Sequence, residues 1–230
     1  MISSSFTQEQ HEFQDFYFLN KPDIQEAAKI FAKSFMYNPI TAYTIPDEKK
    51  RKKKVHYMFE YILQYGINYG LVMSPSSSLE GIAIWLCTPY TTESFIRQLR
   101  SGVLKVVWKL GLSFVKNQQK LRGAIEYVTH ESTKHLDNGF IYLYSFCVDP
   151  AHQGKGYASQ LLRAMITFSE RVAVPIYLET APQDNILMYE HFGFKIMGKK
   201  AIPDSDYVMH GLLREIENKN RGRKQIKKKR

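Results

Sequence analysis

The residues with the clearest chemical potential lie where an apolar stretch ends and a short glycine loop begins. Residues 145–162 read SFCVDPAHQGKGYASQLL, in which an apolar run ends at Val148 and an amphipathic segment follows a polar turn. Gly154 and Gly156 carry no side chain that could obstruct a ligand, so several backbone amides can converge on one anion. The positive end of a following helix dipole would strengthen such a site. The pattern therefore predicts a phosphate-binding loop.

The spacing within the loop separates it from two common nucleotide-binding patterns. It lacks the Lys-Ser/Thr pair of the Walker motif and the GxGxxG spacing of dinucleotide folds. An ordinary strand-to-helix turn is the alternative interpretation. The loop does hold Gln153, Gly156 and Ala158 in the order Gln/Arg-x-x-Gly-x-Gly/Ala, which resembles the pyrophosphate signature of the GNAT superfamily of acetyltransferases.

A second block strengthens this resemblance. Residues 176–194 read IYLETAPQDNILMYEHFGF, a strand pattern followed by Asn185, by Tyr189 four residues later and then by Gly-Phe, in the order and spacing of another GNAT block. The phrases GIAIWLCTP (81–89), VDPAHQGKG (148–156) and VPIYLETAP (174–182) are similar to the group that contains puromycin N-acetyltransferase. The resemblance implies direct transfer of an acetyl group from acetyl-CoA to a primary amine of a small molecule, without a metal ion.

The resemblance also assigns residues to the coenzyme. Backbone groups of Phe146 and Val148 would contact the pantetheine arm, where their strand splays from its parallel neighbour, and Asn185 would contact the same arm. The pyrophosphate would be held by the loop and the first helical turn: Gln153, Gly154, Lys155, Gly156, Tyr157 and Ala158. A solvated loop lysine and a helix cap are the alternative interpretations of Lys155 and Asn185.

Two residues are candidates for proton transfer. Tyr189 matches the family tyrosine whose hydroxyl points at the coenzyme sulfur, where it would act as general acid. Many relatives carry a glutamate base at the position held here by Tyr142, so that carboxylate is absent. Glu179, on the next predicted strand, is the candidate to accept the proton of the amine or to bind a cationic substrate. A locally paired carboxylate is the alternative.

Aromatic residues are the candidates for contact with the acceptor. The connection 38–46 usually forms part of the acceptor wall in the superfamily. Tyr37, Tyr43 and Trp85 are the substrate contacts that we predict, with ordinary core packing as the alternative for each.

The elements that position these residues follow from apolar periodicity. Helices are predicted near 22–35, 49–66, 156–171 and 185–191. Strands are predicted near 15–19, 70–73, 79–88, 140–148, 175–180, 194–201 and 207–213. Strands separated by helices predict an α/β (α+β) domain with a mixed, twisted GNAT-type sheet of about six to seven strands flanked by helices.

Residues 91–134 interrupt this alternation as a helical insertion. Its apolar residues are predicted to face the core: Phe95, Ile96, Leu99, Val103, Val106, Val107, Leu110, Phe114 and Val115. The alternative is a lid or wall over a substrate pocket. A covered pocket would disfavour a protein substrate, because a protein acceptor needs an open groove.

Composition and charge predict the domain organisation. The chain has 230 residues, 44% of them hydrophobic, which is enough for one core. We expect a flexible segment at 1–14, one acetyltransferase domain at 15–214 with its coenzyme-binding part at about 139–200, and a basic, disordered tail at 215–230. The net charge of +10 is concentrated in Lys49–Lys54 and Lys219–Arg230, which hold 14 of the 32 Lys and Arg. The first run fits the exposed start of a helix, and the tail is either solvated or a contact for nucleic acid or another polyanion.

Cysteine usage and hydropathy bear on the compartment. Cys87 and Cys147 each lie in an apolar, strand-like run, which favours reduced buried thiols over a disulfide. The sequence shows neither a secretory pattern nor an apolar run of about 18 residues, so we expect a cytoplasmic protein without a membrane partner. A homodimer remains open. The rival functions are acetylation of protein or peptide amino groups, and a non-catalytic acetyl-CoA-binding regulatory module.

Overall fold

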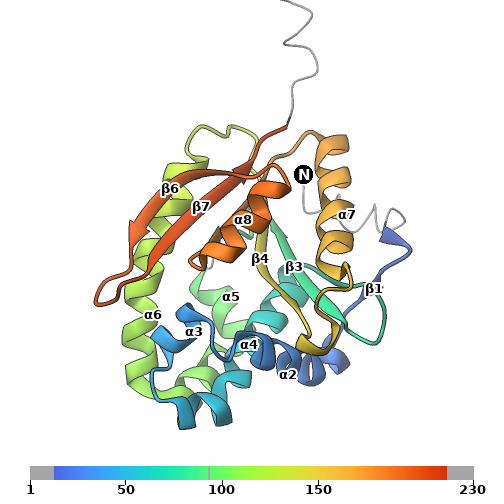
Figure 1. Ribbon diagram of the computed structural model, residues 1–230. Coiled ribbons are helices and arrows are strands. Elements are labelled where there is room, and N and C mark those ends of the chain that lie inside the picture. Colours follow the sequence, from blue (N-terminus) through green and yellow to red (C-terminus); the bar gives the residue numbers. More distant parts are fainter. Residues whose placement is uncertain (1–12, 93, 217–230) are drawn as a thin grey trace, which may run out of the picture.

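The fold is built on one seven-stranded sheet with strand order β1-β2-β3-β4-β5-β7-β6 (Figure 1). The computed structural model describes residues 13–92 and 94–216. Its strands are β1 (Tyr17–Phe18), β2 (Gly70–Ser74), β3 (Gly81–Cys87), β4 (Ile141–Val148), β5 (Ile176–Thr180), β6 (Lys195–Ala201) and β7 (Val208–Arg214). Only β4 and β5 are parallel neighbours among these strands. The predicted mixed sheet is confirmed.

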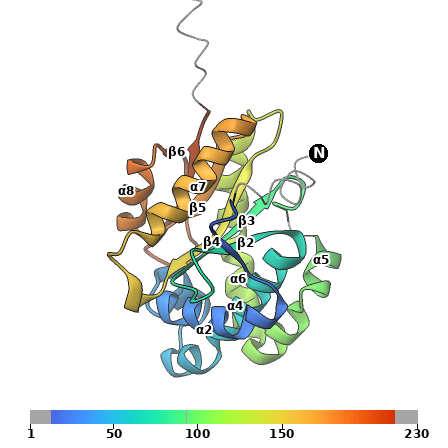
Figure 2. The same ribbon diagram turned by 90° about the vertical axis from the view of Figure 1, so that its right-hand side faces the viewer.

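Helices cover both faces of the sheet (Figures 1 and 2). On one face lie α7 (Tyr157–Val172) and α8 (Gln183–His191), and on the other lie α2 (Ile24–Phe35), α4 (Glu48–Tyr69) and α6 (Val103–Thr133). We call these the α7 face and the α6 face. Shorter elements are η2 (Lys21–Asp23), α3 (Pro39–Thr44), α5 (Phe95–Arg100) and η3 (Pro150–His152). The predicted connection at 38–46 therefore contains a helix of its own.

Alternation along β5 distributes its residues between the two faces. Ile176 and Leu178 belong to the apolar core under α7 and α8, and Tyr177 belongs to an aromatic cluster on the α6 face. Because successive side chains of a strand point to opposite faces, Glu179 lies on the α6 face with Tyr177. The catalytic candidate on β5 therefore shares its face with the helical insertion.

Strand β4 parts from β5 soon after it begins. The two strands pair only at Ile141–Ile176 and Tyr142–Tyr177, although both continue. On its other side β4 stays paired with β3, but the register shifts so that Tyr144 has no partner residue in β3. Such an extra residue is a β-bulge, which bends its strand and recurs next to active sites. The result is a gap between the ends of β4 and β5, as the family resemblance implied.

Residues 91–134 form helices α5 and α6, but the predicted apolar side is only partly buried. Val106, Leu110 and Phe114 are buried, whereas Phe95 and Ile96 are 71% and 62% exposed. The prediction that α5 faces the core was wrong, because the chain turns at a glycine between the two helices, residue 102, with φ of +90°. The two helices therefore do not share one continuous apolar face.

The basic run Lys49–Lys54 lies in the first turns of α4, as predicted, but it is not merely solvated. The ammonium groups of Lys50 and Lys54 donate to the carbonyl oxygens of Leu110 and Lys109, at 2.6 and 2.9 Å. These carbonyls end the first segment of α6, which is broken at the next residue, so they lack partners within their helix. Part of the basic run thus ties α4 to α6.

The boundaries of the domain differ slightly from the expectation. Phe13, which the sequence placed in a flexible segment, is 1% exposed and packs against Phe168 with ring centroids 5.5 Å apart. Residues 1–12 and the tail 217–230 lie outside the described residues. Cys87 and Cys147 are free and buried, as predicted. Within residues 13–92 and 94–216, no helix is long and apolar enough to cross a membrane, and no three His, Cys, Asp or Glu gather as metal ligands.

Candidate active site

The glycine loop and the start of α7 form an open cradle for an anion. Gly154 and Gly156 have φ of +76° and +85°, a region that favours glycine, and Gly156 is the N-cap of α7. A Cβ built at either position would meet no atom within 4 Å, so the space above both is open. The first N–H groups of α7 have no acceptor within the helix and lie beside this space. The residues present therefore fit the pyrophosphate that the sequence predicted here.

The other predicted members of the cradle surround the loop. Gln153 and Lys155 are exposed, and Tyr157 and Ala158 are partly exposed in the first turn of α7. The ammonium of Lys155 donates to the carbonyl of Ala151 at 3.3 Å, which holds the lysine over the loop. The structure thus brings all of the predicted loop residues to one open surface.

Backbone groups of Phe146 and Val148 point into the gap between β4 and β5. The N–H of Asp149 donates to the carbonyl of Glu80 at 2.9 Å, so these two residues form a bonded pair at the end of the β3–β4 ladder. Bonded and non-bonded pairs alternate in an antiparallel ladder, so Phe146 and Val148 turn their N–H and C=O groups away from β3. Ser34 Oγ already donates to the Val148 carbonyl at 3.0 Å. The remaining groups are available to a pseudo-strand such as the pantetheine arm.

Glu179 is held beside the tyrosine that replaces the usual glutamate. The hydroxyl of Tyr142 on β4 donates to Glu179 Oε1, whereas Oε2 is buried and has no hydrogen-bond partner within the described chain. Burial raises the pKa of Glu179 from 4.5 to about 7, although the hydroxyls of Tyr142 and Tyr177 lower it. A carboxylate with a pKa near neutrality can both accept and release a proton. Strand β5 thus places a carboxylate beside the hydroxyl of Tyr142.

Tyr189 lies on the neighbouring helix α8. It is 6% exposed, and its ring packs edge-on against Phe194 with centroids 5.6 Å apart. Burial raises the pKa of its hydroxyl, and the negative charge of Glu179 raises it further. Tyr189 is therefore protonated at neutral pH and suited to donate a proton.

Asn185 connects α8 to the end of β5. The helix begins at Gln183 with Pro182 as its N-cap, so Asn185 is its third residue and not a cap. Its amide nitrogen donates to Thr180 Oγ1 at 3.2 Å. The side chain is thus placed at the last residue of the strand that borders the gap.

Four tyrosines gather on the α6 face and were not predicted from the sequence. We call them the tyrosine cluster: Tyr65, Tyr142, Tyr144 and Tyr177. Ring centroids are 5.6 Å apart for Tyr142–Tyr144 and for Tyr142–Tyr177, and 5.7 Å for Tyr65–Tyr144. The Tyr177 hydroxyl also lies 3.0 Å from Thr129 Oγ1 of α6. The only local indication of this cluster in the sequence was the pair Tyr142 and Tyr144, which are separated by one residue on the predicted strand 140–148. Two members of the cluster, Tyr142 and Tyr177, direct their hydroxyls to Glu179.

The structure does not bring the three predicted acceptor contacts together. Trp85 is completely buried in the core under α7, on the face opposite Glu179. Tyr37 is 72% exposed at the end of α2. Tyr43 lies beside α6, and its hydroxyl donates to the Pro203 carbonyl at 2.9 Å. Of the three, only Tyr43 forms a hydrogen bond with the connection between β6 and β7, to which Pro203 belongs.

Comparisons with known proteins agree with this geometry. Residues 83–194 match the family model described as Acetyltransferase (GNAT) family. An uncharacterized N-acetyltransferase of Schizosaccharomyces pombe is 29% identical over 175 residues, covering 75% of this chain and 70% of that protein. A solved structure from Corynebacterium glutamicum, described as histone acetyltransferase HPA2 and related acetyltransferase, superposes with a TM-score of 0.60 at 19% sequence identity. The match covers 87% of this chain and 95% of that chain. A Drosophila melanogaster polyamine N-acetyltransferase, which forms N-acetylagmatine, gives a TM-score of 0.55, at 10% identity over 88% of this chain and 100% of its own.

Proposed function

Because the chain resembles the GNAT family of acetyltransferases in sequence and in fold, we propose that it is a member of that family and transfers an acetyl group from acetyl-CoA directly to a primary amine of a small molecule. The observation that carries this proposal is the gap between β4 and β5. The glycine loop follows one of the two strands, and Glu179 lies near the end of the other. Acetyl-CoA would supply the acetyl group in activated form, as a thioester.

Binding of the coenzyme is assigned to backbone groups. The loop of residues 153–158 and the start of α7 would hold the pyrophosphate, as the open space above Gly154 and Gly156 supports. Phe146 and Val148 would extend the edge of β4 with hydrogen bonds to the pantetheine arm. Asn185, at the end of β5, would contact the same arm.

Proton transfer is assigned to Glu179 and Tyr189. A primary amine reaches the site mostly as an ammonium ion, which cannot attack until it loses a proton. Glu179, oriented by Tyr142, accepts that proton, and its pKa of about 7 keeps it largely ionised above neutral pH. Tyr189, which is protonated at neutral pH, donates its proton to the departing sulfur. Each group thus carries the charge state that its role requires.

The α6 face favours a small acceptor. The insertion lies across the β7 end of this face, and a Cβ added at Gly211 would come within 2.4 Å of Ser132 Oγ of α6. Such close packing leaves little room for a protein chain to cross the sheet there. The carboxylate and the tyrosine cluster suit a cation, because aromatic rings and a negative charge both attract an ammonium group. An amine of the polyamine type also agrees with the Drosophila neighbour.

The proposal is tested by release of coenzyme A thiol from acetyl-CoA in the presence of different amines. The panel contains polyamines, arylalkylamines, peptide N-termini and, because of the resemblance to the puromycin N-acetyltransferase group, aminonucleosides. We expect release with at least one small amine and none with the peptides. Release with peptides alone would favour the rival protein acetyltransferase. Tight binding of acetyl-CoA without release by any amine would refute the proposed transfer.

A further inference from the structure

Large apolar side chains are exposed along α5 and the first part of α6. We call them the apolar ridge: Phe95, Ile96, Leu104, Trp108 and Leu112, which are 71%, 62%, 67%, 78% and 83% exposed. Leu104 and Trp108 are four residues apart on one helix and therefore lie on the same side of it. Leu112 follows the break in α6 at residue 111, and Phe95 and Ile96 lie on the separate helix α5. Single exposed apolar residues are normal, but five large ones exposed within 18 residues of sequence are more than scattered positions explain.

The surroundings of the apolar ridge are basic. Between Ser94 and Ile125 the sequence holds seven Lys and Arg and no Asp or Glu. Two of these lysines pack on aromatic rings: Lys109 lies 4.3 Å from the ring centroid of Trp108, and Lys105 lies 5.2 Å from that of Tyr57. Three of the seven are ion-paired within the chain, Lys105 with Glu60, Lys120 with Asp204 and Arg122 with Glu126. The excess positive charge of this stretch therefore comes from Arg97, Arg100, Lys109 and Lys116.

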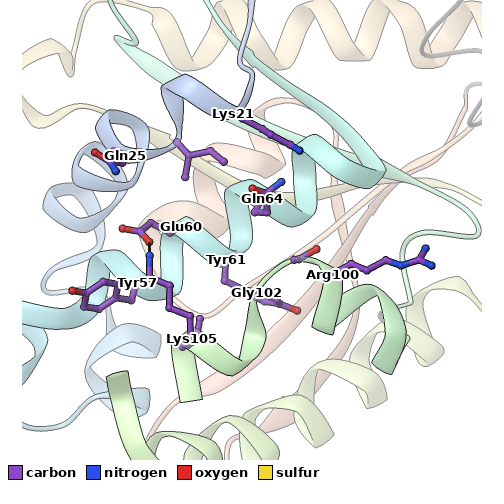
Figure 3. A pocket seen from close by; sticks show the side chains of 12 residues that line it. Lys21, Gln25, Tyr57, Glu60, Tyr61, Gln64, Arg100, Gly102 and Lys105 are labelled. Carbon is purple, nitrogen blue, oxygen red and sulfur yellow. Dashed lines mark hydrogen bonds and ion pairs between the residues drawn. The ribbon is translucent and has the colours of Figure 1, made fainter. Parts of the chain in front are cut away.

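A groove of about 340 Å³ opens beside the ridge, between η2, α4 and the α5–α6 junction (Figure 3). Its lining includes Lys21, Arg100 and Lys105, and its acidic member, Glu60, is ion-paired with Lys105 at 2.6 Å. None of the site residues predicted from the sequence lines this groove. The groove therefore extends the basic surface at a place distinct from the acetyl-transfer site.

We propose that the apolar ridge docks on the surface of an anionic phospholipid bilayer. Leu and Trp side chains gain free energy by entering the boundary between head groups and acyl chains, and Lys and Arg beside them are attracted to anionic head groups. A second copy of this chain fits less well, because two such surfaces would place like charges against each other. In Figure 2 α5 lies at an outer edge of the molecule.

This proposal changes one sequence-based expectation. The chain was predicted to lack a membrane partner because it lacks a spanning segment. Phe95 and Ile96 were assigned to the core, and the other three ridge residues were not singled out. Lying on a bilayer requires neither a long apolar helix nor a closed apolar surface. It requires an apolar side flanked by cations, which only the exposed fractions reveal.

The test is sedimentation of the full chain with phosphatidylcholine vesicles that do or do not contain phosphatidylserine. We expect binding to the anionic vesicles that weakens at high salt, because exposed charges are screened. Replacing Leu104, Trp108 and Leu112 together by Ser should lower the partition coefficient roughly a hundredfold or more. Neutralising Lys109 and Lys116 to Gln should lower it roughly 20- to 30-fold. The basic tail is present in every variant, so it cannot account for these differences.

A matched control replaces three exposed apolar residues elsewhere, Ile196, Met197 and Tyr207, by Ser, and should bind like the unmodified chain. Tryptophan fluorescence gives a second measurement, because Trp85 is fully buried and Trp108 is exposed. Vesicles should shift the emission to shorter wavelength, and Trp108→Phe should abolish this shift while keeping binding.

Three results would overturn the proposal. One is equal partitioning into neutral and anionic vesicles, or none into either. Another is unchanged binding after the triple Ser substitution, which would assign binding to another part of the chain. The third is a dimer in gel filtration that the triple substitution dissociates, because the ridge would then serve a second copy. Acetyl transfer in solution is independent of all three, so failure here leaves the proposed function standing.

Discussion

Glu179→Gln is the substitution that separates a proton-accepting role from a structural one. Gln keeps the size of the side chain and an oxygen that can accept from Tyr142, but it cannot take a proton from an ammonium ion. A positioned general base contributes roughly 10²–10⁴ to the rate. We therefore expect kcat/KM to fall by about this factor at pH 8, with little change in the affinity for acetyl-CoA.

The pH dependence of the unmodified enzyme follows from the raised pKa. Because Glu179 must be ionised to accept a proton, kcat/KM should rise with pH and level off above about pH 7. Tyr142→Phe removes a hydrogen bond that favours the ionised form, so the rise should move to higher pH. Tyr17→Phe is the matched control, since Tyr17 lies on the edge strand β1, away from β4 and β5, and its hydroxyl also donates to a carboxylate, that of Asp23. Thiol release across this pH range measures all three proteins.

The same carboxyl group affects stability, with a sign that can be worked out. Its folded pKa of about 7 lies above the ordinary value of 4.5, so the folded state holds the proton more tightly. The free energy of unfolding then falls as pH rises from about 4.5 to 7 and stays low above it. The shift corresponds to at most ~3 kcal/mol. Glu179→Gln should therefore be more stable than the unmodified chain at pH 8, by denaturant unfolding.

Two outcomes would refute this reasoning about Glu179. If Glu179→Gln kept the rate and the pH profile of the unmodified enzyme, the proton would leave by another route. If the variant were inactive and also less stable at pH 8, the residue would be a structural partner of Tyr142. A slow but more stable variant is the combination that only a buried base predicts.

Three further substitutions test other parts of the site and its support. Tyr189→Phe should lower kcat roughly a hundredfold in steady-state assays without raising the KM for acetyl-CoA; an unchanged kcat would exclude it as the acid. Gly156→Ala forces a residue with a Cβ to adopt φ of +85°, which costs about 1–2 kcal/mol of conformational free energy. The substitution should weaken acetyl-CoA binding in calorimetric titration. Equal affinity would argue against the cradle. Gly211→Ala places a Cβ 2.4 Å from Ser132 Oγ and should lower the free energy of unfolding by about 1–3 kcal/mol, whereas Gly123→Ala, with open space, should not.

Some features of the site depend on residues that are consecutive in the chain, and these were predictable. The glycine loop needs only Gly154 and Gly156 before an amphipathic helix, because backbone freedom and helix polarity are local properties. The same holds for Tyr189, whose distance from Asn185 is set by one helical turn. The order of strands and helices followed from apolar periodicity for the same reason.

Other features depend on which segments meet, and sequence periodicity does not contain this information. The bulge at Tyr144 requires comparing β4 with β3, two strands that lie more than 50 residues apart. The pairing of Tyr142 with Glu179 joins neighbouring strands of the sheet. Phe95 and Ile96 are as apolar as any core residue, and only the turn at residue 102 leaves them exposed.

The sequence by itself therefore determined which local groups are available: a glycine loop that opens a helix, a tyrosine one helical turn after Asn185 and a glutamate on the strand before that helix. Tertiary structure alone decided the electrostatic state of these groups. Burial raises the pKa of Glu179 toward neutrality, and burial together with the negative charge of Glu179 raises the pKa of Tyr189. The physical reason is that propensity and glycine geometry act over a few neighbouring residues, whereas desolvation depends on every segment that packs around a group.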